Sequence, residues 1–304
     1  MSDLKTIQNE TLVGEPMNPG QGQSGAARFP FLAPAEKPGL LGMIESYEVI
    51  GLIARGGMGM VFEALDPGLM RRVAIKVLIP QLAASPEARA RFLREARAAA
   101  AIDHPNVLPV YAVGECQGFP YLVMPLVVGE SLHHRLKRNG PLPLDDLLRI
   151  ALATARGLAA AHERNLIHRD IKPDNVLLET GGGSRVWLAD FGLARAVHDS
   201  GLTRTGAIAG TPQFLSPEQA AGREVDLRSD LFSFGSMLYA MATGGPPFDE
   251  RAPIAVLRRI TEDSPPPPSE KRNDLPPALE DLIAHLMQKA PDDRPASALE
   301  IVES

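Results

Sequence analysis

The chain of 304 residues is 44% hydrophobic and 22% charged, a composition typical of a folded protein rather than a disordered chain. Its formal net charge of −6 and pI near 5.7 provide no overall basic field, so we expect no nucleic-acid partner held through its phosphates. A single cysteine, Cys116, excludes an internal disulfide framework and indicates a reducing compartment. Because no signal peptide begins the chain and no apolar run approaches the ~18 residues of a membrane span, we expect a cytoplasmic protein without a membrane segment.

The first 46 residues are predicted to form a flexible leader. Gly, Pro, Gln and Ser are frequent between Thr11 and Gly42, and no helical or strand period survives there. From Tyr47 onward, short apolar runs between Gly-rich and Pro-Gly turns predict five strands, at 47–52, 60–64, 73–78, 107–114 and 121–128. Residues 86–101 predict a helix that begins after Ser85, a favourable N-cap residue. These elements predict an α+β lobe, with a five-stranded antiparallel sheet and one helix.

The rest of the chain is predicted to be mainly helical. Apolar residues recur at helical spacing over 144–163, the clearest of these segments. Further helices are expected at 230–243, 254–261, 278–289 and from Ala296, with Gly- and Pro-rich loops between them. No internal repeat is visible in the chain.

Two short runs carry the residues with the clearest chemistry: His168–Asn175 (HRDIKPDN) and the Asp-Phe-Gly sequence at 190–192. Asn175 lies five residues after Asp170 and Asp190 lies twenty after it, which suits one base and two magnesium ligands for phosphoryl transfer. Here the chain resembles the protein kinase family, and closely the bacterial serine/threonine kinases of eukaryotic type. The resemblance runs from residue 47 to the C-terminus. It implies a bilobal fold with a small lobe at 47–127, a helical lobe at 128–304 and MgATP in the cleft between them.

The resemblance assigns roles to the polar residues of both runs. Asp170 is expected to be the catalytic base, and Asn175 and Asp190 are expected to bind Mg²⁺ through hard oxygen atoms, with Mn²⁺ as an alternative. His168 is expected to be structural and to pack under Phe191. A surface turn rich in His, Arg and Asp is the alternative, but both runs match together.

The resemblance also implies the acceptor and a mode of regulation. Lys172, two residues past the base, and Thr211, which resembles a threonine that contacts this loop, are typical of kinases that phosphorylate Ser or Thr in proteins. Thr203 and Thr205 are candidate autophosphorylation sites, with another copy of the chain as a further partner. Arg169 would then bind the new phosphate.

Glycines between the first two predicted strands indicate a lid over phosphates. The segment at 53–61 (IARGGMGMV) lets backbone N–H groups approach a phosphate without interference from Cβ atoms. Alone, such a segment is often just a hairpin turn, but its position between two strands favours a kinase lid over a dinucleotide fold. The family pattern has glycine where Ala54 stands, so we expect ATP to bind more weakly here than in an Ala54→Gly variant.

A lysine in an apolar strand requires a charged partner. Lys76 ends the run at 73–76 (VAIK), where an unpaired ammonium would be costly to desolvate, and Glu95 on the following helix is its expected partner. Glu95 could instead be one more solvated charge on a helix rich in Glu and Arg.

The resemblance places adenine at the end of the fifth predicted strand. Met124 would be the gatekeeper, and Pro125 departs from the family pattern by removing one backbone N–H. The complete nucleotide set implied is Ile53, Gly56, Gly57, Gly59, Val61, Ala74, Lys76, Met124, Pro125, Val127 and Leu177.

Two further matches are architectural. Asp230 resembles the aspartate that holds the catalytic-loop backbone, and Arg294 resembles the arginine that pairs with Glu218 at the end of the activation segment.

Two other functions are compatible with a kinase-like sequence: a pseudokinase and a kinase of small molecules. A pseudokinase that acts as a scaffold is favoured only by Ala54 and Pro125, because the lysine, base and metal ligands are all present. A kinase of small molecules would have a related fold, but Lys172, Thr211 and the Ser-Pro-Glu sequence at 216–218 resemble features that shape a cleft for a peptide.

Overall fold

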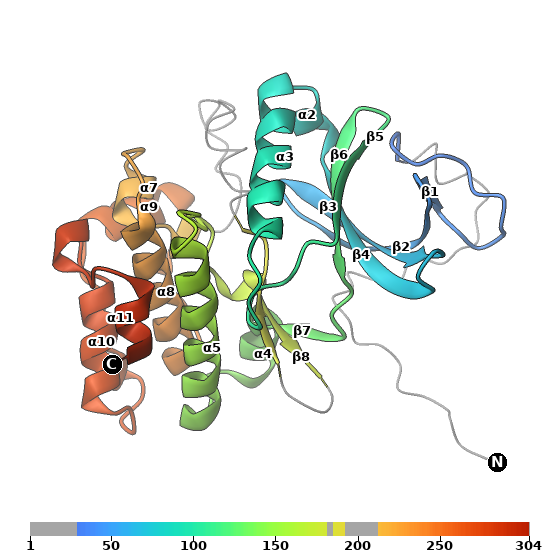
Figure 1. The fold of residues 1–304 in the computed structure, drawn as a ribbon. Helices are drawn as coiled ribbons and strands as arrows, with labels where there is room; N and C mark the ends of the chain where they lie inside the picture. Colours follow the sequence, from blue (N-terminus) through green and yellow to red (C-terminus); the bar gives the residue numbers. More distant parts are fainter. Residues whose placement is uncertain (1–28, 181–184, 192–211, 304) are drawn as a thin grey trace, which may run out of the picture.

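The computed structural model describes residues 29–180, 185–191 and 212–303, and these residues form two lobes. In Figure 1 a sheet-rich lobe that carries α3 lies beside a mainly helical lobe that contains α5, α8 and α10. No helix among the described residues is long and apolar enough to cross a bilayer. The expected bilobal α+β fold is confirmed.

The small lobe is built on one antiparallel sheet of six strands in the order β1-β2-β3-β4-β6-β5. The strands are β1 (Gly42–Ile44), β2 (Tyr47–Arg55), β3 (Gly59–Asp66), β4 (Arg71–Leu78), β5 (Ala112–Cys116) and β6 (Phe119–Pro125). Two helices follow β4: α2 (Pro80–Ala83) and α3 (Pro86–Ala100). The expected N-cap is observed, because the Ser85 hydroxyl accepts from Ala88 N at 3.2 Å. The prediction of five strands and one helix is therefore wrong by one strand and one short helix.

Each face of this sheet has its own apolar cluster. One cluster joins the sheet to the helices, with Phe92 and Ala96 of α3 against Leu78 and Leu122. The other covers the opposite face and includes Phe29, Phe31 and Leu32. The predicted flexible leader is wrong for residues 29–46, since this segment contributes β1 and part of the lobe's core; residues 1–28 lie outside the described residues.

The predicted strand at 107–114 is also corrected. Residues 107–110 are not part of a strand of the small sheet, which the chain joins at Tyr111, whose N donates to Val123 O at 2.7 Å; instead Val107 forms a parallel bridge with Leu188, and Leu108 N donates to Leu188 O at 2.9 Å. The prolines at 105 and 109 explain the difference, because neither can donate to a ladder. The segment therefore connects the small lobe to a strand of the large lobe.

The large lobe combines helices with a three-stranded antiparallel sheet in the order β7-β8-β9. The strands are β7 (Gly129–Ser131), β8 (Val176–Glu179) and β9 (Val186–Leu188). The helices are α4 (Leu132–Asn139), α5 (Leu144–His162), α7 (Pro217–Ala220), α8 (Leu227–Thr243), α9 (Pro253–Glu262), α10 (Pro277–Leu286) and α11 (Ala298–Glu303). In the described part of this lobe, 3₁₀ turns lie at Pro173–Asn175, Pro212–Phe214, Pro268–Glu270 and Pro291–Asp293. α8 is buried along almost its whole length, which makes it the central helix of this lobe.

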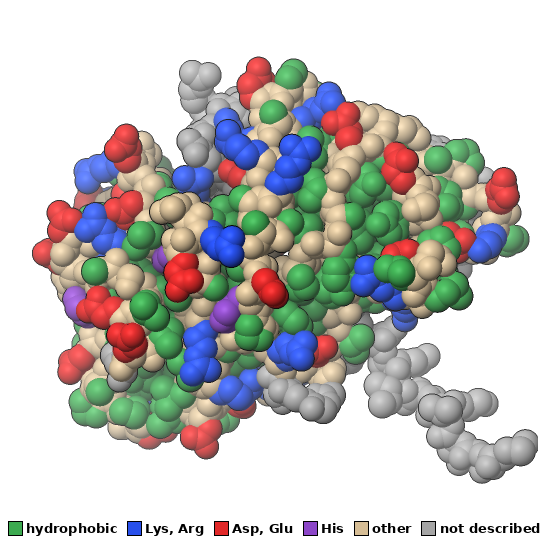
Figure 2. All heavy atoms as spheres, viewed as in Figure 1, with side chains coloured by type: hydrophobic (Ala, Val, Ile, Leu, Met, Phe, Trp, Pro, Cys, Tyr) green, Lys and Arg blue, Asp and Glu red, His purple; other side chains and the backbone are tan. Residues whose placement is uncertain are grey.

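One face of α3 carries a cluster of basic side chains. In Figure 2 Lys and Arg side chains gather over α3, the helix that carries Arg89, Arg91, Arg94 and Arg97. The opposite side of α3 faces the sheet and is apolar, so the helix is amphipathic.

Candidate active site

A cavity of about 410 Å³ lies between the two lobes. The β2–β3 loop and β4 of the small lobe line one wall, and the 170–177 segment of the large lobe lines the opposite wall. β6 and the residues after it line a third side. This volume is typical of a pocket for a small-molecule ligand, about 300–1,000 Å³. Nearly all of the residues predicted for the site line it: Ile53, Gly56, Gly57, Gly59, Val61, Ala74, Lys76, Met124, Pro125, Val127, Asp170, Lys172, Asn175, Leu177 and Asp190.

Two predicted residues are not in this lining. Glu95 is buried on α3. Thr211 lies outside the described residues, as do Thr203 and Thr205.

The glycine loop approaches β4 closely. Gly56 N donates to Gly59 O at 2.9 Å and closes the turn between β2 and β3. A Cβ atom on Gly59 would lie 2.9 Å from Val77 O and 3.3 Å from the Lys76 side chain, so any larger residue would push the loop away from β4. Ala54 follows an irregularity in the β2–β3 register and faces the cavity opposite Val61.

Lys76 does not pair with Glu95. Its Nζ atom lies 2.8 Å from Asp190 Oδ1, and the lysine side chain is only 7% exposed. Burial by itself raises the pKa of Asp190, but the charge and hydrogen bond of Lys76, together with the charges of His168 and Lys172, bring this pKa below its ordinary value. The expected Lys76–Glu95 ion pair is therefore corrected to Lys76–Asp190.

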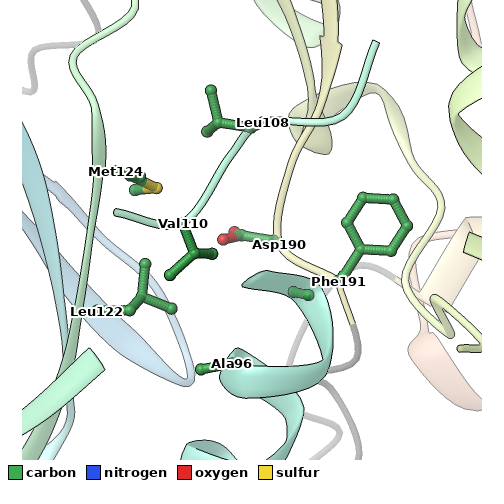
Figure 3. Close-up of a pocket in the computed structure, with 8 residues that line it drawn as sticks. Ala96, Leu108, Val110, Leu122, Met124, Asp190 and Phe191 are labelled. Atoms are coloured by element: carbon green, nitrogen blue, oxygen red, sulfur yellow. The ribbon is translucent and has the colours of Figure 1, made fainter. Parts of the chain in front are cut away.

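A small apolar void separates α3 from Asp190. It measures about 20 Å³ and is lined in part by Ala96 of α3, Leu122 and Met124 of β6, and Phe191. In Figure 3 the Asp190 side chain points toward Val110, across this void from the strand that carries Leu122. The Asp190 carboxylate thus faces the small lobe.

Asp170 is held by two neighbours from its own loop. Lys172 Nζ donates to both Asp170 carboxylate oxygens, at 2.9 and 2.8 Å. Burial by itself lowers the pKa of Lys172, but the charge and hydrogen bond of Asp170, together with the charges of Asp174 and Asp190, bring this pKa above its ordinary value, so the ammonium is retained. Asn175 Nδ2 donates to Asp170 O at 2.7 Å and to Asp170 Oδ2 at 3.0 Å.

His168 joins the 168–175 loop to the segment that ends in Asp190. Its Nε2 donates to Ala189 O at 2.8 Å, and its Nδ1 accepts from Asp170 N at 3.3 Å. Burial lowers its pKa, which agrees with a neutral ring carrying its proton on Nε2. The expected packing on Phe191 is observed, with ring centroids 4.6 Å apart.

Asp230 holds the same loop from α8. Its carboxylate accepts from His168 N and Arg169 N, both at 2.7 Å, and it lies 2.9 Å from His162 Nε2. The carboxylate is fully buried, so these contacts replace its hydration. Arg169 adopts φ 65°, a conformation that non-glycine residues seldom hold without such contacts.

The second expected architectural pair is also present. Arg294 Nη1 lies 2.8 Å from Glu218 Oε1, and Arg294 Nη2 lies 2.9 Å from Glu218 Oε2, with both side chains buried. The Ser229 hydroxyl donates to the same carboxylate. This bidentate contact fixes α7 against the 294 loop.

The site can offer oxygen ligands to a divalent cation. Asn175 uses its amide nitrogen toward Asp170, which leaves its amide oxygen for another partner, and Asp190 supplies a carboxylate on the same cavity wall. The described residues contain no group of three or more His, Cys, Asp or Glu arranged for a metal. A cation held by two hard ligands would need further oxygen atoms, and phosphates supply these to Mg²⁺.

Sequence reasoning missed several residues of the cavity wall. Leu108, Glu130, Ser131 and Asp174 line it but were not predicted. Asp174 lies inside the HRDIKPDN run, so its position next to Asn175 was an available signal. Leu108 had none, because its place depends on the contact between residues 107–108 and β9.

Comparisons with known proteins agree with this geometry. A family model described as "Protein kinase domain" matches residues 47–304. The serine/threonine-protein kinase PknB of Mycolicibacterium smegmatis is 39% identical over 263 residues, covering 84% of this chain and 42% of that protein. The serine/threonine-protein kinase pkn3 of Myxococcus xanthus is 40% identical over 261 residues, covering 83% and 48% respectively. The chain thus spans less than half the length of these two relatives.

A solved structure has the same fold. The crystal structure of the Mycobacterium tuberculosis PknI kinase domain aligns with a TM-score of 0.69 and 32% identity, covering 88% of this chain and 97% of that one.

Proposed function

Because the chain belongs to the protein kinase family, we propose that it transfers the γ-phosphate of ATP to serine or threonine hydroxyls of protein substrates. The observation that carries the proposal is the convergence of Lys76, Asp170, Asn175 and Asp190 on one cavity between the lobes. A base, an ammonium and two hard oxygen ligands are what phosphoryl transfer requires of a protein.

The cavity would receive the nucleotide in two parts. The adenine ring would lie between Val61 and Ala74 on one side and Leu177 on the other, with its edge toward the backbone of residues 125–127. The triphosphate would then lie under the glycine loop and reach Lys76. Asn175 and Asp190 would hold Mg²⁺, which would neutralise the charge that develops on the transferred phosphoryl group.

Asp170 would orient the attacking hydroxyl and accept its proton. Lys172 contacts both Asp170 oxygens, so its ammonium would also lie beside the transferred phosphate and stabilise its charge.

Regulation by autophosphorylation is part of the proposal. Phosphate on Thr203 or Thr205 would pair with Arg169, the residue directly before the base. Mass spectrometry after incubation with ATP should find phosphate on at least one of these threonines. Activity toward a protein substrate with neither threonine phosphorylated would contradict this part alone.

The test of the proposed function compares the wild type with Asp170→Asn. With MgATP and a generic protein substrate, the wild type should produce phosphoserine or phosphothreonine, and the variant should lose roughly 10²–10⁴-fold in kcat. Lack of transfer by the wild type together with normal ATP binding would favour a pseudokinase. Phosphate transfer to sugars or antibiotics in preference to protein would favour a small-molecule kinase.

A further inference from the structure

Gln219 bridges two segments that the motifs treat separately. It is the third residue of α7, which Ser216 caps: Gln219 N donates to the Ser216 hydroxyl at 3.3 Å, and Ser216 N donates to Gln219 Oε1 at 3.0 Å. This reciprocal capping box uses only the oxygen of the Gln219 amide. The amide nitrogen crosses to the catalytic loop and donates to Arg169 O at 2.8 Å.

The carbonyl that Gln219 holds belongs to the peptide bond that leads into the base. Arg169 C=O and Asp170 N–H are the two ends of that peptide, and Asp170 N donates to His168 Nδ1. Because a peptide unit is planar, fixing both ends fixes the direction in which Asp170 leaves the backbone. Arg169 has φ 65°, so this orientation depends on outside contacts.

The contacts that Asp230 makes with this turn do not include its carbonyl. Asp230 accepts the N–H groups of His168 and Arg169, but a carboxylate cannot hold a carbonyl oxygen. The base of α7 is itself rigid, since Glu218, the residue before Gln219, is bound by Arg294. Gln219 therefore contacts the loop from a helix whose position is fixed.

We propose that Gln219 is a positioning residue for Asp170, which it orients through the Arg169 carbonyl. The position of α7 would then determine the orientation of the Asp170 side chain. The inference rests on the proposed kinase function for its effect on turnover. The effect of Gln219 on the conformation of the 168–170 turn can be measured without ATP, by hydrogen exchange.

Two substitutions separate positioning from helix capping. Gln219→Glu keeps an oxygen for Ser216 N, and glutamate is a regular capping-box residue, but it cannot donate to Arg169 O. Ser216→Ala removes the hydroxyl cap and leaves the Gln219 amide free to hold Arg169 O. Gln288→Met is the remote control, because Gln288 Nε2 also donates to a backbone carbonyl, that of Ala284, on an exposed helix end.

Gln219→Glu is expected to lower kcat roughly 10- to 100-fold, as a small misplacement of a catalytic group does, with KM for ATP unchanged. Hydrogen exchange at the Arg169 and Asp170 amides should become faster. Ser216→Ala should lower Tm by ~2–4 °C, as the loss of a helix cap does, and should cost far less in kcat than Gln219→Glu. Gln288→Met should change neither kcat nor the exchange of these amides.

If Gln219→Glu does not fold, Gln219→Met replaces it, because methionine places no charge against the carbonyl. The same fall in kcat and the same faster exchange are expected. The inference is overturned if the Gln219 variant keeps wild-type turnover and wild-type exchange, or if Ser216→Ala reproduces its loss of kcat. An inactive wild type would refute the proposed function instead. Exchange at residues 168–170 would then still decide whether Gln219 controls the turn.

Discussion

The Lys76 ammonium lies 2.8 Å from the Asp190 carboxylate, so the group expected to hold phosphate and the group expected to hold the metal neutralise each other. Glu95, the expected partner of the lysine, is buried on α3, the helix whose Ala96 lines the small void next to Asp190. A nucleotide with its cation would have to replace the Lys76–Asp190 contact by contacts of its own. Lys76 and Asp190 stay in contact with each other until the nucleotide replaces this contact.

Replacing Lys76 by methionine should abolish phosphotransfer while the protein stays folded. The change removes the positive charge next to the phosphates and leaves Asp190 without its ammonium partner, so kcat/KM should fall at least ~100-fold. Lys37→Met is a matched control, because Lys37 pairs with Glu48 at the surface of the same lobe. Phosphate release from labelled ATP, measured beside Tm, checks the result. Full turnover in Lys76→Met would remove the lysine from the mechanism.

The methyl group of Ala54 should weaken ATP binding. It faces the cavity on the strand that enters the glycine loop, where the family pattern has glycine. Ala54→Gly should lower the Kd for ATP by a factor on the order of a few-fold, whereas glycine in a strand should slightly lower Tm. Ala112→Gly, in β5 and outside the cavity wall, should lower Tm without changing Kd. Calorimetric titration that gave equal affinities for Ala54→Gly and the wild type would contradict the prediction.

Arg294 should matter for folding before it matters for catalysis. Its guanidinium is fully buried against Glu218, and removal of one partner of such a pair costs about 3–5 kcal/mol. Arg294→Ala should therefore unfold well below the wild-type Tm. Arg258→Ala removes an exposed pair with Glu262, which water and salt screen, and should melt near the wild type. A normal Tm for Arg294→Ala would refute the structural role.

The same pair should make stability depend on pH. Burial by itself raises the pKa of Glu218, but hydrogen bonds from Arg294 and Ser229, together with the Arg294 charge, bring its folded-state pKa below the ordinary value. Such a carboxyl group stabilises the fold above its unfolded-state pKa and loses that contribution as pH falls through the folded-state pKa. The difference in unfolding free energy between wild type and Arg294→Ala should be largest near neutral pH and should narrow below about pH 4. Chemical denaturation across this range measures it; a constant difference would contradict the assignment.

What the sequence predicted well depends on residues that are close together in the chain. Asp170, Lys172 and Asn175 lie in one loop, so their mutual contacts follow from a local conformation. Strand periodicity is also a local property of the chain, and it placed Lys76 correctly within β4, where the side chain lines the cavity. The partner of Lys76 could not be obtained in this way, because the choice between Glu95 and Asp190 depends on how α3 packs against the sheet.

The leader shows a different limit. Prolines and polar residues dominate residues 1–46, and composition alone predicts a flexible chain there. The signal for a folded segment was short: Phe29, Phe31 and Leu32 are large apolar residues within four positions. What they cover is a face of the sheet formed by strands far along the chain, so their burial could not be derived locally.

The segment at 29–46 should be required for a stable small lobe, although the family match begins only at residue 47. Phe31 is fully buried, with its ring 5.5 Å from that of Phe62 and 5.4 Å from that of Phe119. The Cys116 thiol donates to Phe31 O, and β1 extends the sheet beside β2. Removal of residues 1–46 would expose this face of the sheet to water and restore an unprotected edge strand.

Phe31→Ala should destabilise the protein by about 3–5 kcal/mol, which lowers Tm by roughly 10 °C in a domain of this size. Deletion of residues 1–46 should lower Tm at least as much, because it removes Phe31 together with β1. Deletion of residues 1–28 is the matched control and should leave Tm unchanged, since it keeps Phe29, Phe31 and Leu32. Thermal unfolding of the three variants in parallel decides the point. If the protein that begins at residue 47 melts like the wild type, the aromatic contacts to Phe62 and Phe119 do not stabilise the lobe.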